Sequence, residues 1–66
     1  MYFNYHAKAK KKIREGKCTG FKIVEHYHNI SPCLLLFFDD DSVMPIRKYK
    51  FDDYLFLLFS QNIKEK

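Results

Sequence analysis

Six consecutive apolar residues in the middle of the chain constrain its fold more than any other feature. Residues 33–38, with the sequence CLLLFF, follow the turn-forming segment 29–32 and precede the acidic segment 39–42. A run of this length between Asn, Ser, Pro and Asp residues favours a strand over a helix. Because side chains alternate across a strand, both of its faces are apolar. We therefore expect a central strand that is covered on both sides, or one whose second face meets a partner.

Two further strands are expected, one on each side of this run. Residues 19–28 alternate in polarity and contain aromatic and β-branched side chains, as a half-buried strand does. One face of this strand carries Phe21, Ile23 and Tyr27, and the other carries Lys22, His26 and His28. Residues 43–49 form the third expected strand. Pro45 places it at a sheet edge or a bulge, because proline cannot donate a ladder hydrogen bond.

Helices are expected near both ends of the chain. Residues 4–15 have the helical period, with Asn4 as the N-cap and Gly16 just beyond the C-terminal end. The apolar stripe of this helix consists of Tyr2, Tyr5, His6, Ala9 and Ile13, opposite Lys8, Lys11, Arg14 and Glu15. Residues 52–64 form the second expected helix, with Asp52 as its N-cap and a hydrophobic staple between Phe51 and Phe56.

The resulting prediction is a single small domain over residues 1–66 of the α+β class. A three-stranded antiparallel meander is flanked by N- and C-terminal helices, in the order α-β-β-β-α. A chain of 66 residues buries a small core, so each core side chain matters. The core is predicted to contain Ile23, Leu35, Phe37, Ile46, Tyr54, Leu55, Leu58 and Phe59.

Composition and cysteine use point to a cytoplasmic protein. The first residues lack the apolar segment of a signal peptide, and no apolar run approaches the ~18 residues of a membrane span. Two cysteines, Cys18 and Cys33, are fewer than small secreted domains usually carry. We expect both thiols to be free in a reducing compartment.

No metal, cofactor or catalytic site is expected. Cys18, His26, His28 and Cys33 offer zinc-ligand chemistry, but their spacing lacks the paired C-x2-C knuckle. The acidic residues 39–41 lack the alternating frame of a calcium loop and are predicted to form a solvated turn. His6, His26, His28 and Glu25 are the candidates for acid–base chemistry. The chain has no nucleophile motif and little volume for a closed active site, so we expect that it is not an enzyme.

The charge is concentrated at the N-terminal end. The chain carries a formal charge of +4, and its first 24 residues hold seven Lys and Arg against a single Glu. Lys8, Lys11, Lys12 and Arg14 are therefore candidate phosphate contacts of a small nucleic-acid-binding protein. The element order resembles that of the double-stranded-RNA-binding domain, whose last helix begins with phosphate-clamping lysines. Asp52 and Asp53 occupy that position here and would repel phosphate.

The second helix suggests a different function. Leu57 lies off its predicted core arc, and Phe56 and Ile63 lie at the far side, so the helix is apolar around most of its girth. Such a helix is normally buried on more than one side, which a chain of this size cannot provide alone. The leading hypothesis is a protein-interaction or regulatory module that forms a homodimer, with Phe56 and Leu57 at the interface. Nucleic-acid binding through the first helix is the alternative.

Overall fold

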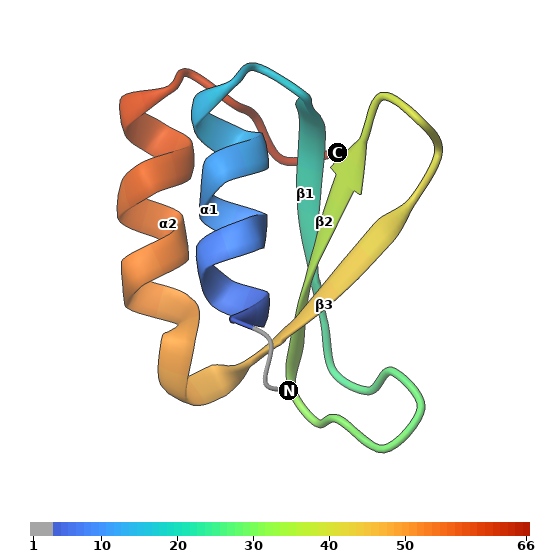
Figure 1. Cartoon of the computed structure of the whole chain (residues 1–66). Coiled ribbons are helices and arrows are strands. Elements are labelled where there is room, and N and C mark those ends of the chain that lie inside the picture. The colour runs from blue at the N-terminus through green and yellow to red at the C-terminus, as the bar shows by residue number, and fades with distance from the viewer. Residues whose placement is uncertain (1–3) are drawn as a thin grey trace.

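The computed structural model describes residues 4–66 and shows two helices packed on one sheet (Figure 1). The elements are α1 (Tyr5–Arg14), β1 (Cys18–Val24), β2 (Cys33–Phe38), β3 (Val43–Arg47), the 3-10 turn η1 (Lys48–Lys50) and α2 (Phe51–Ser60). The strands form one antiparallel sheet in the order β1-β2-β3. The predicted α-β-β-β-α order and the α+β class are therefore confirmed. The two helices lie side by side on the same face of the sheet.

Local side-chain and backbone chemistry sets both ends of α1. The Oδ1 atom of Asn4 accepts a hydrogen bond from the backbone N–H of Ala7 at 3.0 Å, which caps the first turn. At the other end, Gly16 adopts a φ of 79°, a left-handed conformation that glycine reaches without strain. The N–H of Lys17 then donates to the carbonyl of Lys12 at 3.0 Å and closes the helix. Both predicted helix signals, Asn4 and Gly16, are confirmed.

The start of α2 differs from the prediction. The helix follows η1 directly, so Phe51 is already helical and Lys50 stands at the cap position. Lys50 makes no side-chain capping hydrogen bond. Asp52 is therefore not the N-cap, and that prediction is wrong because the chain enters the helix through a continuous 3-10 turn. Asp52 and Asp53 lie in the first turn instead, where carboxylates favour the positive end of the helix dipole.

The end of α2 also comes earlier than predicted. The helix ends at Ser60 because Asn62 adopts a left-handed conformation with a φ of 60°. The N–H of Ile63 donates to the carbonyl of Leu58 at 2.9 Å, and the N–H of Asn62 donates to the carbonyl of Phe59 at 3.1 Å. This pair of hydrogen bonds is the Schellman motif, in which the residue after the left-handed one packs back on the helix. Ile63 does so against the core.

The residues after this turn run along the open edge of β1. The N–H of Phe21 donates to the carbonyl of Lys64 at 3.3 Å, and the N–H of Lys66 donates to the carbonyl of Phe21 at 2.8 Å. Glu65 and Phe21 thereby form a parallel bridge. This pairing is possible only because the helix stops at Ser60. The opposite edge of the sheet is β3, which contains Pro45 as predicted for an edge strand.

The core lies between the sheet and the two helices. It consists of Ala9, Ile13, Cys18, Phe21, Leu34, Leu36, Phe38, Ile46, Tyr54 and Leu58. Alternate residues of β2 supply its centre, and the intervening Cys33 and Leu35 are buried as well. No helix within residues 4–66 is both long and apolar enough to cross a bilayer.

The predicted core is confirmed at its centre and wrong at two positions. The four confirmed residues are Leu35, Ile46, Tyr54 and Leu58. Phe37 and Leu55 are half-buried. Ile23 is 42% exposed because it lies near the end of β1, outside the core cluster. Phe59 is 63% exposed because Tyr54 and Leu58 define the buried side of α2, and Phe59 follows Leu58 by 100° around the helix. Tyr2, placed on the apolar stripe of α1, lies outside the described residues.

Candidate functional site

The outer side of α2 exposes two phenylalanine rings. Phe56 is 77% exposed and Phe59 is 63% exposed, and their spacing of three residues places them next to each other on the helix. We call this pair the α2 aromatic face. Phe56 projects opposite the buried side of α2, which is defined by Tyr54 and Leu58. Phe59 also contacts the ring of Phe21 edge-on, with 6.2 Å between the two ring centres.

A hollow adjoins this aromatic face at the end of α2. It has a volume of about 210 Å³ and is lined by Phe59, Asn62, Ile63 and Lys64. The left-handed turn at Asn62 shapes it, because the chain leaves the helix axis there. The α2 surface therefore combines a projecting ring, Phe56, with a depression that begins about one turn further along.

The other predicted interface residue, Leu57, has a different environment. Its side chain is half-buried and packs against the core. The expectation that Leu57 lies off the core arc is wrong, because Leu57 is only about 60° around the helix from the buried Tyr54 and packs against the core. Its participation in an interface stays a prediction, and Phe56 is the more exposed of the two.

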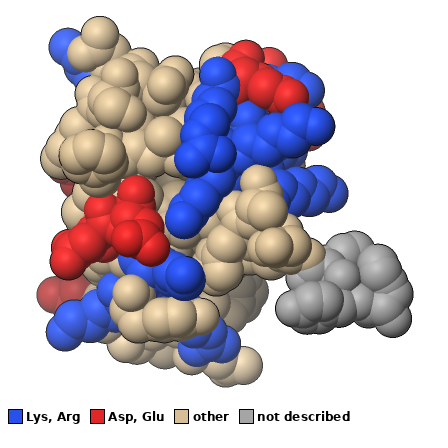
Figure 2. Space-filling model, turned by 60° about the vertical axis from the view of Figure 1, so that its left-hand side comes forward, with Lys and Arg blue, Asp and Glu red and all other residues tan. Residues whose placement is uncertain are grey.

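Three of the four predicted phosphate contacts share the outer side of α1. Lys8, Lys11 and Arg14 are exposed at intervals of three residues. Figure 2 shows Lys and Arg side chains gathered beside a broad surface without charged groups. Lys11 lies 3.9 Å from a carboxylate oxygen of Glu15, and within residues 4–66 neither Lys8 nor Arg14 has an ion pair. We call Lys8, Lys11 and Arg14 the α1 basic face.

Lys12 is placed differently from these three. Its Nζ atom lies 4.5 Å from the ring centre of Phe38 and 3.8 Å from Oδ2 of Asp40. Hydrogen bonds from Ser42 hold Asp40 in the turn and lower the pKa of its carboxyl. Lys12 therefore contacts the sheet and this turn, and is less available to a partner than the α1 basic face.

The candidate zinc ligands are not assembled by the fold. β1 ends at Val24, so His26 and His28 lie in the following loop instead of on a strand face. That part of the prediction is wrong because the chain turns at His28, whose φ is 52°. Cys18 and Cys33 are free and buried, and burial raises the pKa of the Cys18 thiol. Among the described residues, no three His, Cys, Asp or Glu side chains are placed to bind a metal ion.

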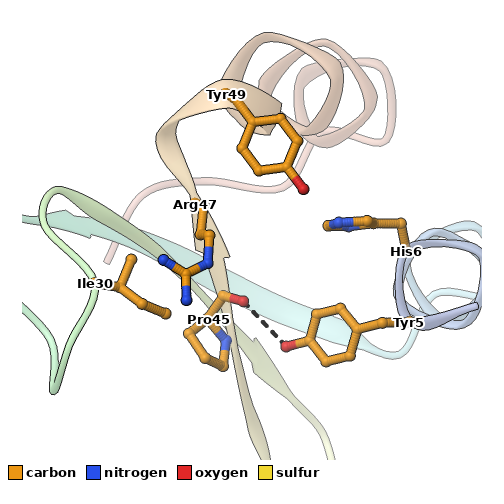
Figure 3. A pocket seen from close by; sticks show the side chains of 6 residues that line it. All are labelled: Tyr5, His6, Ile30, Pro45, Arg47 and Tyr49. Atoms are coloured by element: carbon orange, nitrogen blue, oxygen red, sulfur yellow. Dashed lines mark hydrogen bonds between the residues drawn. The ribbon is translucent and has the colours of Figure 1, made fainter.

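A second hollow, of about 350 Å³, lies where the start of α1 meets β3 and η1 (Figure 3). Its lining residues are Tyr5, His6, Ile30, Pro45, Arg47 and Tyr49. The hydroxyl of Tyr5 donates to the carbonyl oxygen of Pro45 at 3.0 Å and ties α1 to the edge strand. Arg47 extends its guanidinium between Ile30 and Pro45. We call this hollow the Arg47 groove.

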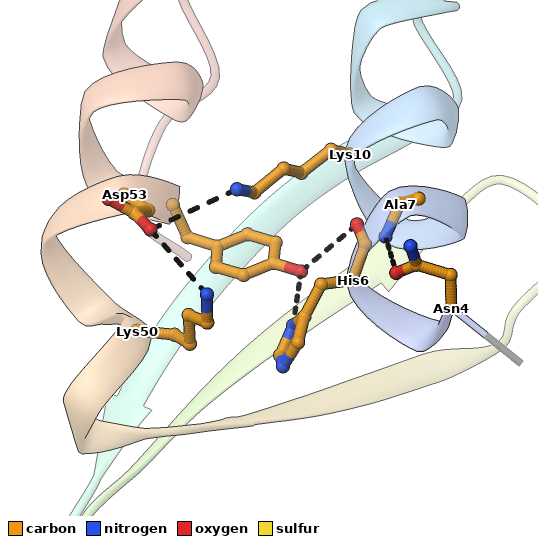
Figure 4. Close-up of polar contacts among 7 residues, drawn as sticks. Asn4, His6, Ala7, Lys10, Lys50 and Asp53 are labelled. Atoms are coloured by element: carbon orange, nitrogen blue, oxygen red, sulfur yellow. Dashed lines mark hydrogen bonds and ion pairs between the residues drawn. The ribbon is translucent and has the colours of Figure 1, made fainter.

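His6 lines the Arg47 groove and forms a hydrogen bond with Tyr54 of α2. Figure 4 shows His6 on α1, with the ion pairs of Asp53 to Lys10 and Lys50 nearby. The Nδ1 atom of His6 and the hydroxyl of Tyr54 share a hydrogen bond of 2.8 Å, and that hydroxyl also donates to the His6 carbonyl at 3.4 Å. Partial burial, followed by the charges of Lys50 and Lys10, lowers the pKa of His6 from 6.5, with Asp53 acting in the opposite direction. These effects favour the neutral form of the imidazole. Burial also raises the pKa of Tyr54.

The Arg47 groove is not predictable from the sequence. Tyr5 and His6 belong to the predicted apolar stripe of α1, and no motif contains Arg47 or Tyr49. These residues come from α1, β3 and η1, so no fixed spacing in the sequence connects them. The one available signal is that an aromatic and a histidine directly follow the N-cap Asn4, where a helix end meets other elements.

No protein-family model matches the chain, and no curated protein and no solved structure matches it. Function is therefore inferred from the surfaces themselves. The structure places the α2 aromatic face and the α1 basic face on one helical layer, because the two helices lie side by side. It places the Arg47 groove at the end of that layer where both helices begin.

Proposed function

We propose that the protein is a non-catalytic interaction module that acts as a homodimer through the α2 aromatic face. The observation that carries the proposal is the exposure of Phe56 beside the hollow at Asn62 and Ile63. Transferring a Phe side chain from water to an apolar site contributes about 1.5–3 kcal/mol. A symmetric interface gains this contribution twice.

The arrangement of ring and hollow suits a two-fold axis. Phe59, at the near edge of the hollow, follows Phe56 by roughly 4.5 Å along the helix, from the rise per residue. If two copies meet with antiparallel α2 helices, the ring of each copy faces the hollow of the other. Such an interface is isologous, because the same patch serves both subunits and the assembly closes as a dimer. A second copy is therefore the partner that this surface fits best.

The substitution Phe56→Lys tests this proposal. It places a charge at the centre of the interface and is expected to shift the protein to monomer, while the exposed position leaves the fold intact. Sedimentation velocity over a wide range of protein concentrations measures the change. Tyr49→Lys is the matched control, because Tyr49 is 74% exposed and lies outside the α2 aromatic face.

Leu57→Lys is a poorer test because the side chain packs partly against the core, so loss of the dimer and loss of the fold would be confounded. A wild-type protein that sediments as a single monomeric species at high micromolar concentration contradicts the proposal. Equal dissociation of the Phe56→Lys and Tyr49→Lys variants contradicts the assignment of the interface.

Nucleic-acid binding is the second candidate function, supported by the exposure of Lys8, Lys11 and Arg14 along one side of α1. Side chains at this spacing can follow a phosphate backbone without reading sequence. Asp52 and Asp53 on the neighbouring helix, and Glu15 next to Lys11, oppose this function. The dimer proposal is therefore preferred.

The reversal Lys8→Glu with Arg14→Glu tests the second candidate. If the α1 basic face binds DNA or RNA, affinity falls uniformly across sequences and the salt slope flattens by about 0.9 for each lost phosphate contact. Fluorescence anisotropy at several salt concentrations provides the measurement. The double reversal Lys22→Glu with Lys48→Glu, at exposed positions outside α1, controls for the general change in charge. Absence of DNA and RNA binding by the wild type at low salt rules this function out.

A further inference from the structure

The walls of the Arg47 groove are flat and apolar. The rings of Tyr5 and Tyr49, together with Pro45 and Ile30, form its sides (Figure 3). Aromatic rings and proline favour a planar apolar group between them, because offset stacking adds to the gain from burial. A volume of about 350 Å³ falls in the range of small-molecule sites.

The groove contains one cation that no acidic side chain neutralises. Within residues 4–66, Arg47 has no ion pair, whereas Lys10 and Lys50 both lie 3.9 Å from Oδ2 of Asp53. The guanidinium of Arg47 lies between Ile30 and Pro45, two other lining residues of the hollow (Figure 3). Its planar set of donors matches a carboxylate or a phosphate in a two-point contact.

The polar groups around Arg47 are held in place before any ligand arrives. Tyr5 is fixed by its hydrogen bond to Pro45, and His6 by its hydrogen bond to Tyr54. With Nδ1 of His6 engaged by Tyr54, the remaining ring nitrogen, Nε2, is free to face the groove. Groups that are already ordered lose little conformational entropy when they bind a ligand.

We propose that the Arg47 groove is a binding site for a small organic carboxylate with a planar apolar body. The carboxylate pairs with the guanidinium of Arg47, and the planar body lies between Tyr5 and Tyr49. A single guanidinium balances a single negative charge, which favours a carboxylate over a phosphate dianion. This site is separate from the α2 aromatic face and does not depend on dimer formation.

The test uses benzoate as the probe and two arginine variants of the full chain. Titration of the isotope-labelled protein with benzoate is followed in amide spectra, where the signals of Tyr5, His6, Arg47 and Tyr49 are expected to move together. Arg47→Gln should weaken benzoate binding by about tenfold or more, the loss of one charge-assisted contact. Arg14→Gln is the matched control, because it removes the same charge from the exposed side of α1 and should leave the affinity unchanged.

Two further probes define the chemistry. Benzamide has the shape of benzoate without its charge and is expected to bind at least about tenfold more weakly. Phenyl phosphate carries more charge on the same ring and is expected to bind no more tightly than benzoate. The proposal is overturned if benzoate does not shift the signals of the groove residues. It is also overturned if benzamide binds as tightly as benzoate, or if Arg47→Gln and Arg14→Gln weaken benzoate binding equally. Phenyl phosphate that binds tenfold more tightly overturns the choice of a carboxylate.

Discussion

Replacing Leu58 by alanine is expected to lower the free energy of unfolding by about 2–5 kcal/mol. Leu58 is fully buried at the centre of the core, between the helices and the sheet. The substitution removes apolar burial and leaves a cavity that the surrounding side chains fill only in part. Denaturant unfolding followed by circular dichroism measures the change.

The neighbouring substitution Phe59→Ala provides the control for Leu58→Ala. Phe59 is the next residue of the same helix but is largely exposed, so its loss is expected to cost no more than about 1 kcal/mol. A chain of this size has a total stability of about 3–10 kcal/mol, so Leu58→Ala should leave a measurable unfolded population. Equal effects of the two substitutions on the free energy of unfolding would mean that α2 does not bury the side that carries Leu58.

The second large effect is expected at Gly16, where Gly16→Val should cost about 1–2 kcal/mol or more. A β-carbon at Gly16 meets nothing within 4 Å, so the cost does not come from a clash with other residues. It comes from the φ of 79°, at which a β-branched side chain collides with its own backbone. Thermal unfolding of the variant and the wild type gives the difference.

Gly16→Asn separates backbone strain from any general effect of a side chain at this position. Asparagine tolerates the left-handed conformation better than other residues, so this variant should lose clearly less stability than Gly16→Val. The chain itself contains an example, since Asn62 ends α2 in the same conformation. Equal losses in the two variants would contradict the assignment of the cost to φ.

The element order was predictable because the helical and strand periods are local properties of the chain. The change from the helical spacing of residues 4–15 to the alternation of residues 19–28, and back to helical spacing in residues 52–64, predicted the order of the two helices and three strands. The caps of α1 were equally local, since Asn4 and Gly16 act within one turn of the helix. The bounds of α2 were not set locally. Taken alone, the residues of the 3-10 turn before α2 and of the Asn62 turn after it are also compatible with a longer helix.

The functional surfaces were only partly predictable. Phe56 was identified because a helix with apolar residues on all sides must expose some of them. Leu57 was expected to be exposed and is half-buried, whereas Phe59 was expected in the core and is largely exposed. Which flank of α2 is covered depends on its packing against other elements, such as the contact of Phe59 with Phe21 of β1. Such packing is a long-range property that local spacing does not reveal. The Arg47 groove depends entirely on such packing, since it exists only where α1, β3 and η1 meet.

The pairing of residues 64–66 with β1 has a consequence for the synthesis of the protein. On the ribosome, β1 is made early, and the residues that bond to its outer edge at Phe21 emerge only after the rest of the domain. Until then the nascent chain presents a strand edge with unpaired N–H and C=O groups, the type of surface from which aggregation starts. The edge of β1 is therefore most vulnerable to aggregation before residues 64–66 have paired with Phe21.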